Sequence, residues 1–93
     1  MQVVWSPRAV QHLAELRRFI AKENPKAASK VARRILDVVQ ILSSMPHAGR
    51  PGRISGSREF VVTDTPFIIV YRVVAKTLEI IAVLHGAQKW PAT

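Results

Sequence analysis

The spacing of apolar residues in the first half of the chain predicts two amphipathic helices. The first starts after Ser6-Pro7, a hydroxyl cap followed by proline, and stops near Glu23. Its apolar positions recur at helical spacing: Val10, Leu13, Leu16 or Arg17, and Ile20. Asn24-Pro25 repeats the start signal, and the second helix carries a continuous stripe of Ala28, Val31, Ile35, Val38 and Leu42. The short connection predicts an antiparallel helix hairpin.

The second half reads as strands. Residues 2–5 predict a short first strand, and residues 58–62, 67–73 and 78–84 predict an antiparallel meander. A two-residue turn at Ala75-Lys76 sets Arg72 opposite Glu79. For the preceding turn, pairing Thr63 with Ile68 avoids setting Arg58 against Arg72, since like charges across strands repel. This register predicts a row of Glu59, Arg72 and Glu79 across three strands.

Strand alternation then assigns the two faces of the sheet. One face is almost wholly apolar and should pack on the helix hairpin. It carries Phe60, Val62, Phe67, Ile69, Tyr71, Val73, Leu78, Ile80, Ala82 and Leu84. The other face shows Val61, Ile68, Val70, Ile81 and Val83. This strip is either a partner surface or is covered by the C-terminal segment with Trp90.

The predicted fold class is therefore α+β. A short N-terminal strand precedes an antiparallel helix hairpin packed on one face of a three- to four-stranded antiparallel sheet. At 93 residues the chain makes one domain, spanning 1–93.

Charge and composition narrow the functional classes. Fourteen Lys and Arg against six Asp and Glu give a net charge of +8, which favours an acidic protein, nucleic acid or an anionic surface as partner. The absence of cysteine excludes disulfides, thiolate metal sites and a cysteine nucleophile. The first residues lack the apolar core of a signal peptide, and no apolar run is long enough to span a bilayer. A cytoplasmic protein is expected.

Candidate chemistry is sparse. Residues 45–56 form a long Gly/Pro-rich loop, and Arg50, Arg53 and Arg58 lie in or next to it. These arginines could contact nucleic-acid phosphates or an acidic partner, or they could simply form a solvated face. The three histidines lack metal-ligand spacing, and we expect neither metal nor cofactor. His12 should lie on a solvated helix face. His85, at a strand end, acts as a general acid/base or binds a turn. Arg72 is either a phosphate clamp or an ion-pair partner of the flanking glutamates.

The order strand, helix, helix, loop and three strands resembles the RelE/ParE toxin superfamily over nearly the whole chain. The residues that carry the resemblance are Trp5-Ser6-Pro7, Ala9 and Leu13, Asn24-Pro25-Lys26-Ala27-Ala28, Pro46 with Gly49-Arg50-Pro51-Gly52, Gly56-Ser57-Arg58-Glu59, Ile69-Val70-Tyr71-Arg72 and Val83-Leu84-His85-Gly86-Ala87.

The resemblance implies the toxin of a type II toxin–antitoxin system, with a cognate antitoxin encoded beside it. The antitoxin is expected to be an acidic or amphipathic segment that folds along the toxin in a hetero-oligomer. It would bind the strip of Val61, Ile68, Val70, Ile81 and Val83, and operator DNA would be reached only through the antitoxin.

Two branches of the superfamily have different targets. One inhibits DNA gyrase by protein binding, and the other cuts mRNA in the ribosome. The ending His85-Gly86-Ala87 with Trp90-Pro91 looks more like the gyrase branch, and Phe67 stands where nucleases commonly have arginine. The candidate residues for contact with the target or with nucleic acid are Arg50, Arg53, Arg58, Lys89 and Trp90. The nuclease alternative implies catalysis by Arg58, Arg72, His85 and Lys89, and a third alternative is a non-toxic antitoxin-binding module.

Overall fold

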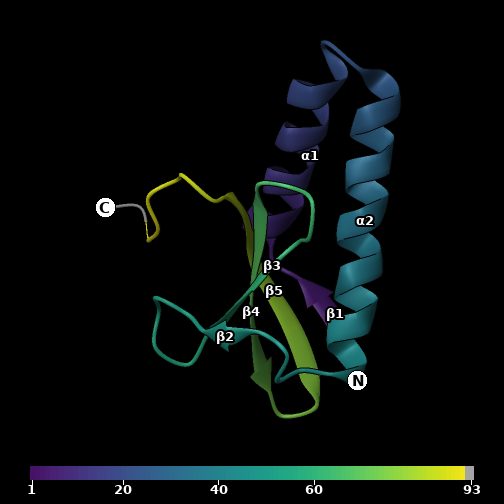
Figure 1. The fold of residues 1–93 in the computed structure, drawn as a ribbon. Coiled ribbons are helices and arrows are strands. Elements are labelled where there is room, and N and C mark those ends of the chain that lie inside the picture. Colours follow the sequence, from purple (N-terminus) through teal and green to yellow (C-terminus); the bar gives the residue numbers. More distant parts are fainter. Residues whose placement is uncertain (92–93) are drawn as a thin grey trace.

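The computed structural model describes residues 1–91. The elements in chain order are β1 (Gln2–Trp5), α1 (Pro7–Ala21), α2 (Pro25–Ser44), β2 (Arg50–Pro51), β3 (Arg58–Val61), β4 (Phe67–Val74) and β5 (Thr77–His85). The helices form a hairpin along one side of the sheet, and the C-terminal segment lies on the other side (Figure 1). The predicted α+β class and its layering are confirmed.

The sheet has five strands in the order β1-β5-β4-β3-β2, more than the three or four predicted. β1 pairs in parallel with β5, whereas the other pairs are antiparallel. The additional strand β2 consists only of Arg50 and Pro51 and lies at the edge. An edge is where a proline, which has no N–H to donate, can be accommodated in a sheet.

Both helix starts follow the predicted capping chemistry. The Ser6 hydroxyl accepts a hydrogen bond from the Ala9 N–H at 3.0 Å, and the Asn24 side chain accepts one from the Ala27 N–H at the same distance. In α2, all of the predicted stripe except half-buried Val31 is buried. In α1 the apolar prediction was wrong for Val10, which is 54% exposed. Within residues 1–91, neither helix is long and apolar enough to cross a membrane.

The register between β3 and β4 differs by two residues from the prediction. Glu59 lies opposite Val70, and Phe60 lies opposite Ile69. The predicted row of Glu59, Arg72 and Glu79 is therefore wrong, although the Arg72–Glu79 pair is confirmed. The Thr65 hydroxyl fixes this register from inside the turn by donating to the Val62 carbonyl and accepting from the Phe67 N–H. Because a shift of two preserves the faces, Phe60 and Val62 still join the helix-side core.

A β-bulge between β4 and β5 changes the face assignment beyond Ile80. Tyr71 pairs with Ile80 but Val70 pairs with Ala82, which leaves Ile81 without a partner across β4. Ser6 binds the bulge: its N–H donates to the Ile80 carbonyl and its hydroxyl donates to the Ile81 carbonyl, both at 2.9 Å. As a result Val83 joins the helix-side core, and the assignment of Ala82 and Leu84 to that face was wrong.

The C-terminal segment covers the second face of the sheet. Trp90 is 8% exposed and packs with Val70, Ala82 and Leu84, while Ile54 of the Gly/Pro-rich loop packs against the same cluster. The Arg8 guanidinium lies 5.8 Å from the centre of the Trp90 ring, within the range of a cation–π contact. Of the two alternatives left open for the apolar strip, coverage by the chain's own C-terminal segment is the one observed.

Candidate functional site

The Gly/Pro-rich loop is fixed to the sheet through Tyr71. This fully buried side chain donates from its hydroxyl to the Pro46 carbonyl at 2.8 Å and accepts from the Gly49 N–H at 2.9 Å. Arg58 adds a third contact, donating to the Gly49 carbonyl at 2.7 Å. The first half of the loop is therefore held in one position relative to β3 and β4.

Glu59 holds the second half of the loop. Its carboxylate is 2% exposed and accepts hydrogen bonds from the Arg53 backbone N–H at 2.9 Å and from the Arg53 guanidinium at 3.1–3.3 Å. The Arg50 guanidinium lies 3.6 Å away. Burial raises the pKa of Glu59, but the Arg53 hydrogen bonds and the charges of Arg53 and Arg50 outweigh it, so the pKa lies below its ordinary value.

The five predicted target contacts fall into two groups. Arg50, Arg53 and Arg58 come together around Glu59 and Gly49, although Glu59 neutralises part of their charge. The Arg50 side chain remains 63% exposed. In the C-terminal segment Lys89 is exposed, whereas Trp90 is buried and presents little surface to a target.

The four residues required by the nuclease alternative do not converge. Arg58 lies on the helix-side face, bound to Gly49, while Arg72 lies on the opposite face and donates to Glu79 at 2.8 Å. His85 pairs with Phe67, roughly 17 Å of strand away from Arg72. Lys89 lies beyond His85 in the C-terminal segment. Arg58 and Arg72 therefore lie on opposite faces of the sheet, and each is bound to a group of the chain itself.

The strip predicted to bind an antitoxin is mostly inaccessible. Ile68, Val70 and Val83 are 6% exposed or less, and Ile81 is half-buried. Val61 is 49% exposed and is the member that presents most surface. The strip also does not share one face, because the bulge turns Val83 toward the helices.

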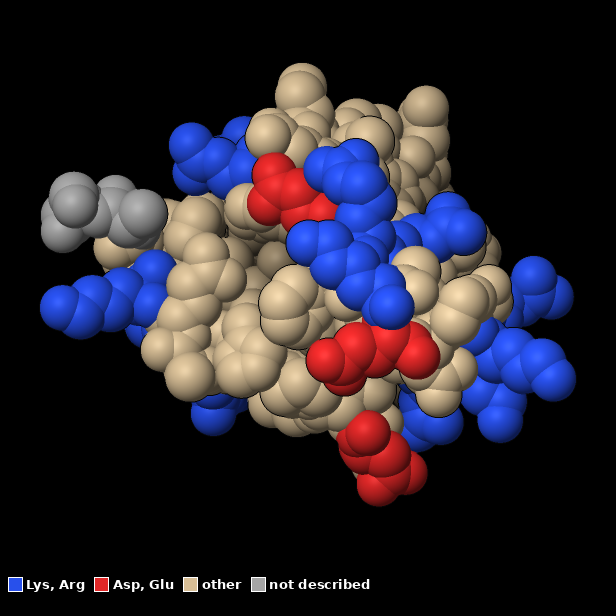
Figure 2. Space-filling view, turned by 90° about the horizontal axis from the view of Figure 1, so that it is seen from above, with Lys and Arg blue, Asp and Glu red and all other residues tan. Residues whose placement is uncertain are grey.

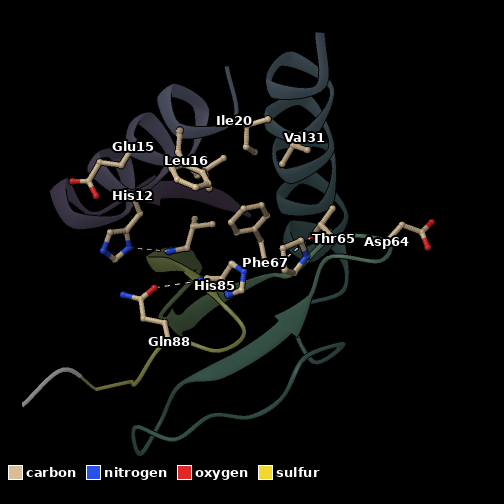
Figure 3. A pocket seen from close by; sticks show the side chains of 13 residues that line it. His12, Glu15, Leu16, Ile20, Val31, Asp64, Thr65, Phe67, His85 and Gln88 are labelled. Carbon is tan, nitrogen blue, oxygen red and sulfur yellow. Dashed lines mark hydrogen bonds between the residues drawn. The ribbon is translucent and has the colours of Figure 1, made fainter. Parts of the chain in front are cut away.

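An open surface lies between the helix hairpin and the end of the sheet. Here a groove of about 650 Å³, which we name the hairpin groove, has an apolar floor. Its apolar lining consists of Leu16, Phe19, Ile20, Val31, Phe67 and Val83, together with Pro66 at the turn. Its polar lining consists of His12, Glu15, Asp64, Thr65, His85 and Gln88. Figure 3 shows Leu16, Ile20, Val31 and Phe67 in the middle, with Glu15 and Asp64 at opposite ends.

Two histidines line the hairpin groove, His12 near Glu15 at one end and His85 beside Phe67. The Nδ1 atom of His12 accepts a hydrogen bond from the Val83 N–H at 3.2 Å, so His12 is half-buried and the predicted solvated position was wrong (Figure 3). Desolvation by burial holds the pKa of His12 below its ordinary value of 6.5, with Glu15 acting in the opposite direction. His85 is exposed, stacks edge-on against Phe67 and accepts a hydrogen bond from the Ala87 N–H through Nδ1.

On the face seen from above, the charged side chains are mostly basic (Figure 2). Viewed toward the hairpin end, blue Lys and Arg side chains exceed the red Asp and Glu and surround tan areas (Figure 2). Against this background the hairpin groove has no Lys or Arg in its lining. Among residues 1–91, no group of three or more His, Cys, Asp or Glu could hold a metal ion.

Sequence reasoning missed the hairpin groove. Its clearest signal was Phe19, an aromatic residue among Arg17, Arg18 and Lys22 that lies outside the predicted apolar positions of its helix. Phe19 is 75% exposed, the highest value among the large exposed hydrophobic residues of the described chain. The other members come from both helices, the β3–β4 turn, β4, β5 and the C-terminal segment, so only the fold brings them together.

Comparison with known proteins identifies the family. Residues 3–90 match the family model described as ParE toxin of type II toxin–antitoxin system, parDE. Protein Y4kP of Sinorhizobium fredii is 42% identical over 97% of this chain and 93% of its own length. Toxin RelE2 of Caulobacter vibrioides is 33% identical over 94% of this chain and 97% of its own length.

A solved structure agrees with both. A chain of the chromosomal ParDE toxin–antitoxin system of P. aeruginosa superposes with a TM-score of 0.81 at 25% identity, covering 91% of this chain and 95% of that one. The order of elements, the family model and the relatives point the same way. The chain belongs to the ParE toxin family of the RelE/ParE superfamily, the toxin components of type II toxin–antitoxin systems.

Proposed function

We propose that this toxin inhibits DNA gyrase in the cytoplasm by protein binding, without cutting nucleic acid itself. The observation that carries the proposal is the separation of Arg58, Arg72 and His85. Arg58 is bound to Gly49, Arg72 is paired with Glu79 on the opposite face, and His85 lies roughly 17 Å of strand from Arg72. General acid–base cleavage of RNA needs catalytic side chains within hydrogen-bond reach of the 2′-hydroxyl proton and of the leaving oxygen of one nucleotide step.

The loop arginines supply the proposed contact with gyrase. Tyr71, Arg58 and Glu59 hold the loop against the sheet, so binding there requires little additional ordering. Of the two arginines that pair with Glu59, Arg50 has a more exposed side chain than Arg53. We propose that Arg50 and Lys89 contact an acidic surface of the target.

The proposal is tested by inducing this chain alone in a bacterial host while viability, the SOS response and message integrity are followed. We expect growth arrest with SOS induction and intact message, and the purified chain should inhibit DNA supercoiling by gyrase. Cut message without SOS would instead support a ribosome-dependent nuclease. Normal growth would support a non-toxic antitoxin-binding module.

A charge-matched pair of variants tests the contact surface. Arg50→Gln should weaken gyrase inhibition several-fold, whereas Arg17→Gln removes the same charge from an exposed position on α1 and should not. Equal losses in both variants would mean that net charge alone is responsible, and the loop contact would be abandoned.

A further inference from the structure

The exposed side of α2 carries a row of basic residues. Lys26, Lys30 and Arg34 follow one another at intervals of four residues, and all three are exposed. Residues four apart are neighbours on a helix surface, so these positions lie about 6 Å apart along the axis. None of the three has an ion-pair partner within residues 1–91. We name these three residues the α2 row.

Two carboxylates lie beside the α2 row without neutralising it. Asp37 lies 3.7 Å from Arg33, which adjoins the row, and both side chains are largely exposed, so solvent screens this pair. Asp64 lines the same recess of about 320 Å³ as Lys30 and Arg34, but no ion pair joins it to either residue. The first half of α2 therefore presents a positive surface.

Helix stability does not explain the α2 row. Like charges four residues apart destabilise a helix, and both the Lys26–Lys30 pair and the Lys30–Arg34 pair are of this kind. α2 also has no acidic residue in its first turn, where the macrodipole disfavours the charge of Lys26. Arg18 differs, because it lies in the last turn of α1, where the dipole favours a cation. The row thus opposes the stability of its own helix, which favours a role in binding.

The side chains between the cations indicate the class of ligand. Ala27, Ala28, Ser29 and Ala32 are small, and Val31 is half-buried against the core. Protein partners bind chiefly through large anchors in desolvated pockets, and this stretch of α2 offers none. Single-stranded nucleic acid stacks its bases on aromatic side chains, and the recess beside the row has no aromatic residue in its lining. A duplex needs only cations for its phosphates, and it has a higher axial charge density than a single strand.

We propose that the α2 row binds the phosphate backbone of duplex DNA, independently of base sequence. Cations about 6 Å apart along the helix do not share one phosphate oxygen, so each contacts a phosphate of its own. Phosphate contacts position a protein on the duplex but carry no sequence information. Recognition of operator DNA therefore remains with the antitoxin, as expected for the family.

This inference goes beyond the proposed function and does not depend on it. The first half of α2 lies toward the hairpin end of the molecule, whereas β2 and the loop with Arg50 lie toward the other end (Figure 1). The two surfaces can therefore be occupied at the same time. A toxin bound to DNA through the α2 row is held close to the substrate of gyrase.

The purified chain and a short labelled DNA duplex of mixed sequence provide the test, without gyrase or antitoxin. Fluorescence anisotropy should show an affinity that falls linearly with salt on logarithmic axes. Lys30→Gln/Arg34→Gln should weaken binding at least tenfold at about 50 mM salt and reduce the salt slope by about 2. Arg17→Gln/Lys76→Gln removes the same types of charge from exposed positions outside the row and should change both quantities much less.

Two controls separate binding from folding. Lys30→Arg/Arg34→Lys keeps both charges and should bind the duplex as the parent does. Lys30→Gln/Arg34→Gln should melt close to the parent's temperature by circular dichroism, because it removes like-charge repulsion along α2. A clear loss of stability in that variant would mean that the row has a structural role, and the inference would fall.

The remaining outcomes identify the ligand. Equal losses in the two glutamine variants would mean that net charge alone binds DNA, and the α2 row would be abandoned. Tighter binding of single-stranded RNA than of the duplex would overturn the assignment to duplex DNA. Polyglutamate that displaces the duplex as effectively as unlabelled DNA of equal charge would indicate an acidic protein instead. Gyrase inhibition is measured separately by supercoiling, so failure of either proposal leaves the other standing.

Discussion

The backbone of Gly49 lies directly against the phenol of Tyr71. Its N–H donates to the Tyr71 hydroxyl at 2.9 Å, and a β-carbon at position 49 would lie 2.6 Å from the same oxygen. A side chain at this position would force either the loop or the Tyr71 ring to move. One close approach thus positions the loop that carries Arg50 and Arg53.

Tyr71→Phe should destabilise the protein, because it removes the hydrogen bonds to Pro46 and Gly49 from a buried site. Loss of partners for two backbone groups predicts a cost of about 1–3 kcal/mol in the free energy of unfolding. Urea denaturation measures it. An unchanged midpoint would mean that water or loop movement satisfies both groups.

Glu59 predicts a loss of stability in acid. Its pKa is lower in the folded chain, so its contribution is fully present above the ordinary value of 4.5 and is lost as the pH falls through the lowered folded value. Glu59→Gln should remove this part of the pH dependence and cost about 1–2 kcal/mol at neutral pH, since the arginine partners reach solvent. Melting temperatures of both proteins between pH 3 and pH 7 provide the comparison.

His12 predicts a second acid-sensitive region at higher pH. Burial lowers its pKa from 6.5, so the folded state binds the proton less readily than the unfolded state. Stability should therefore be greatest above 6.5 and decrease as the pH falls through that value toward the lowered pKa. A His12→Gln variant should lack this slope. If its thermal stability changes with pH as the parent's does between pH 5 and 7, His12 is not the group responsible.

Arg72→Leu should have a small effect. Because Glu59 lies opposite Val70, Arg72 forms an ion pair with one carboxylate, that of Glu79, and not with two. The Arg72 and Glu79 side chains are 51% and 32% exposed, so solvent screens the pair. The expected cost is about 0.2–1 kcal/mol by chemical denaturation. A cost of several kcal/mol would point to a second partner for Arg72.

Trp90→Ala should expose the second face of the sheet. Trp90 packs on Val70, Ala82 and Leu84, and the substitution should cost about 3 kcal/mol or somewhat less near the chain end. A fluorescent dye specific for exposed apolar surface should bind the variant more strongly than the parent. If neither stability nor dye binding changes, the segment does not cover this face in solution.

The sequence by itself determined the local structure and its main layers. Ser6-Pro7 and Asn24-Pro25 start the helices, the α2 stripe selects its buried face, and the turn at Ala75-Lys76 sets Arg72 opposite Glu79. These features depend on capping and periodicity within one segment or across one tight turn, which a linear pattern contains.

Only the tertiary structure decided the features that depend on distant segments. The bulge at Ile81 is bound by Ser6, 75 residues earlier, and it turns Val83 toward the helices. The hairpin groove and the covering of the sheet strip by Trp90 likewise bring together segments far apart in the chain. Alternation along one strand contains no information about an extra residue or a returning segment, because both are fixed by contacts across the fold.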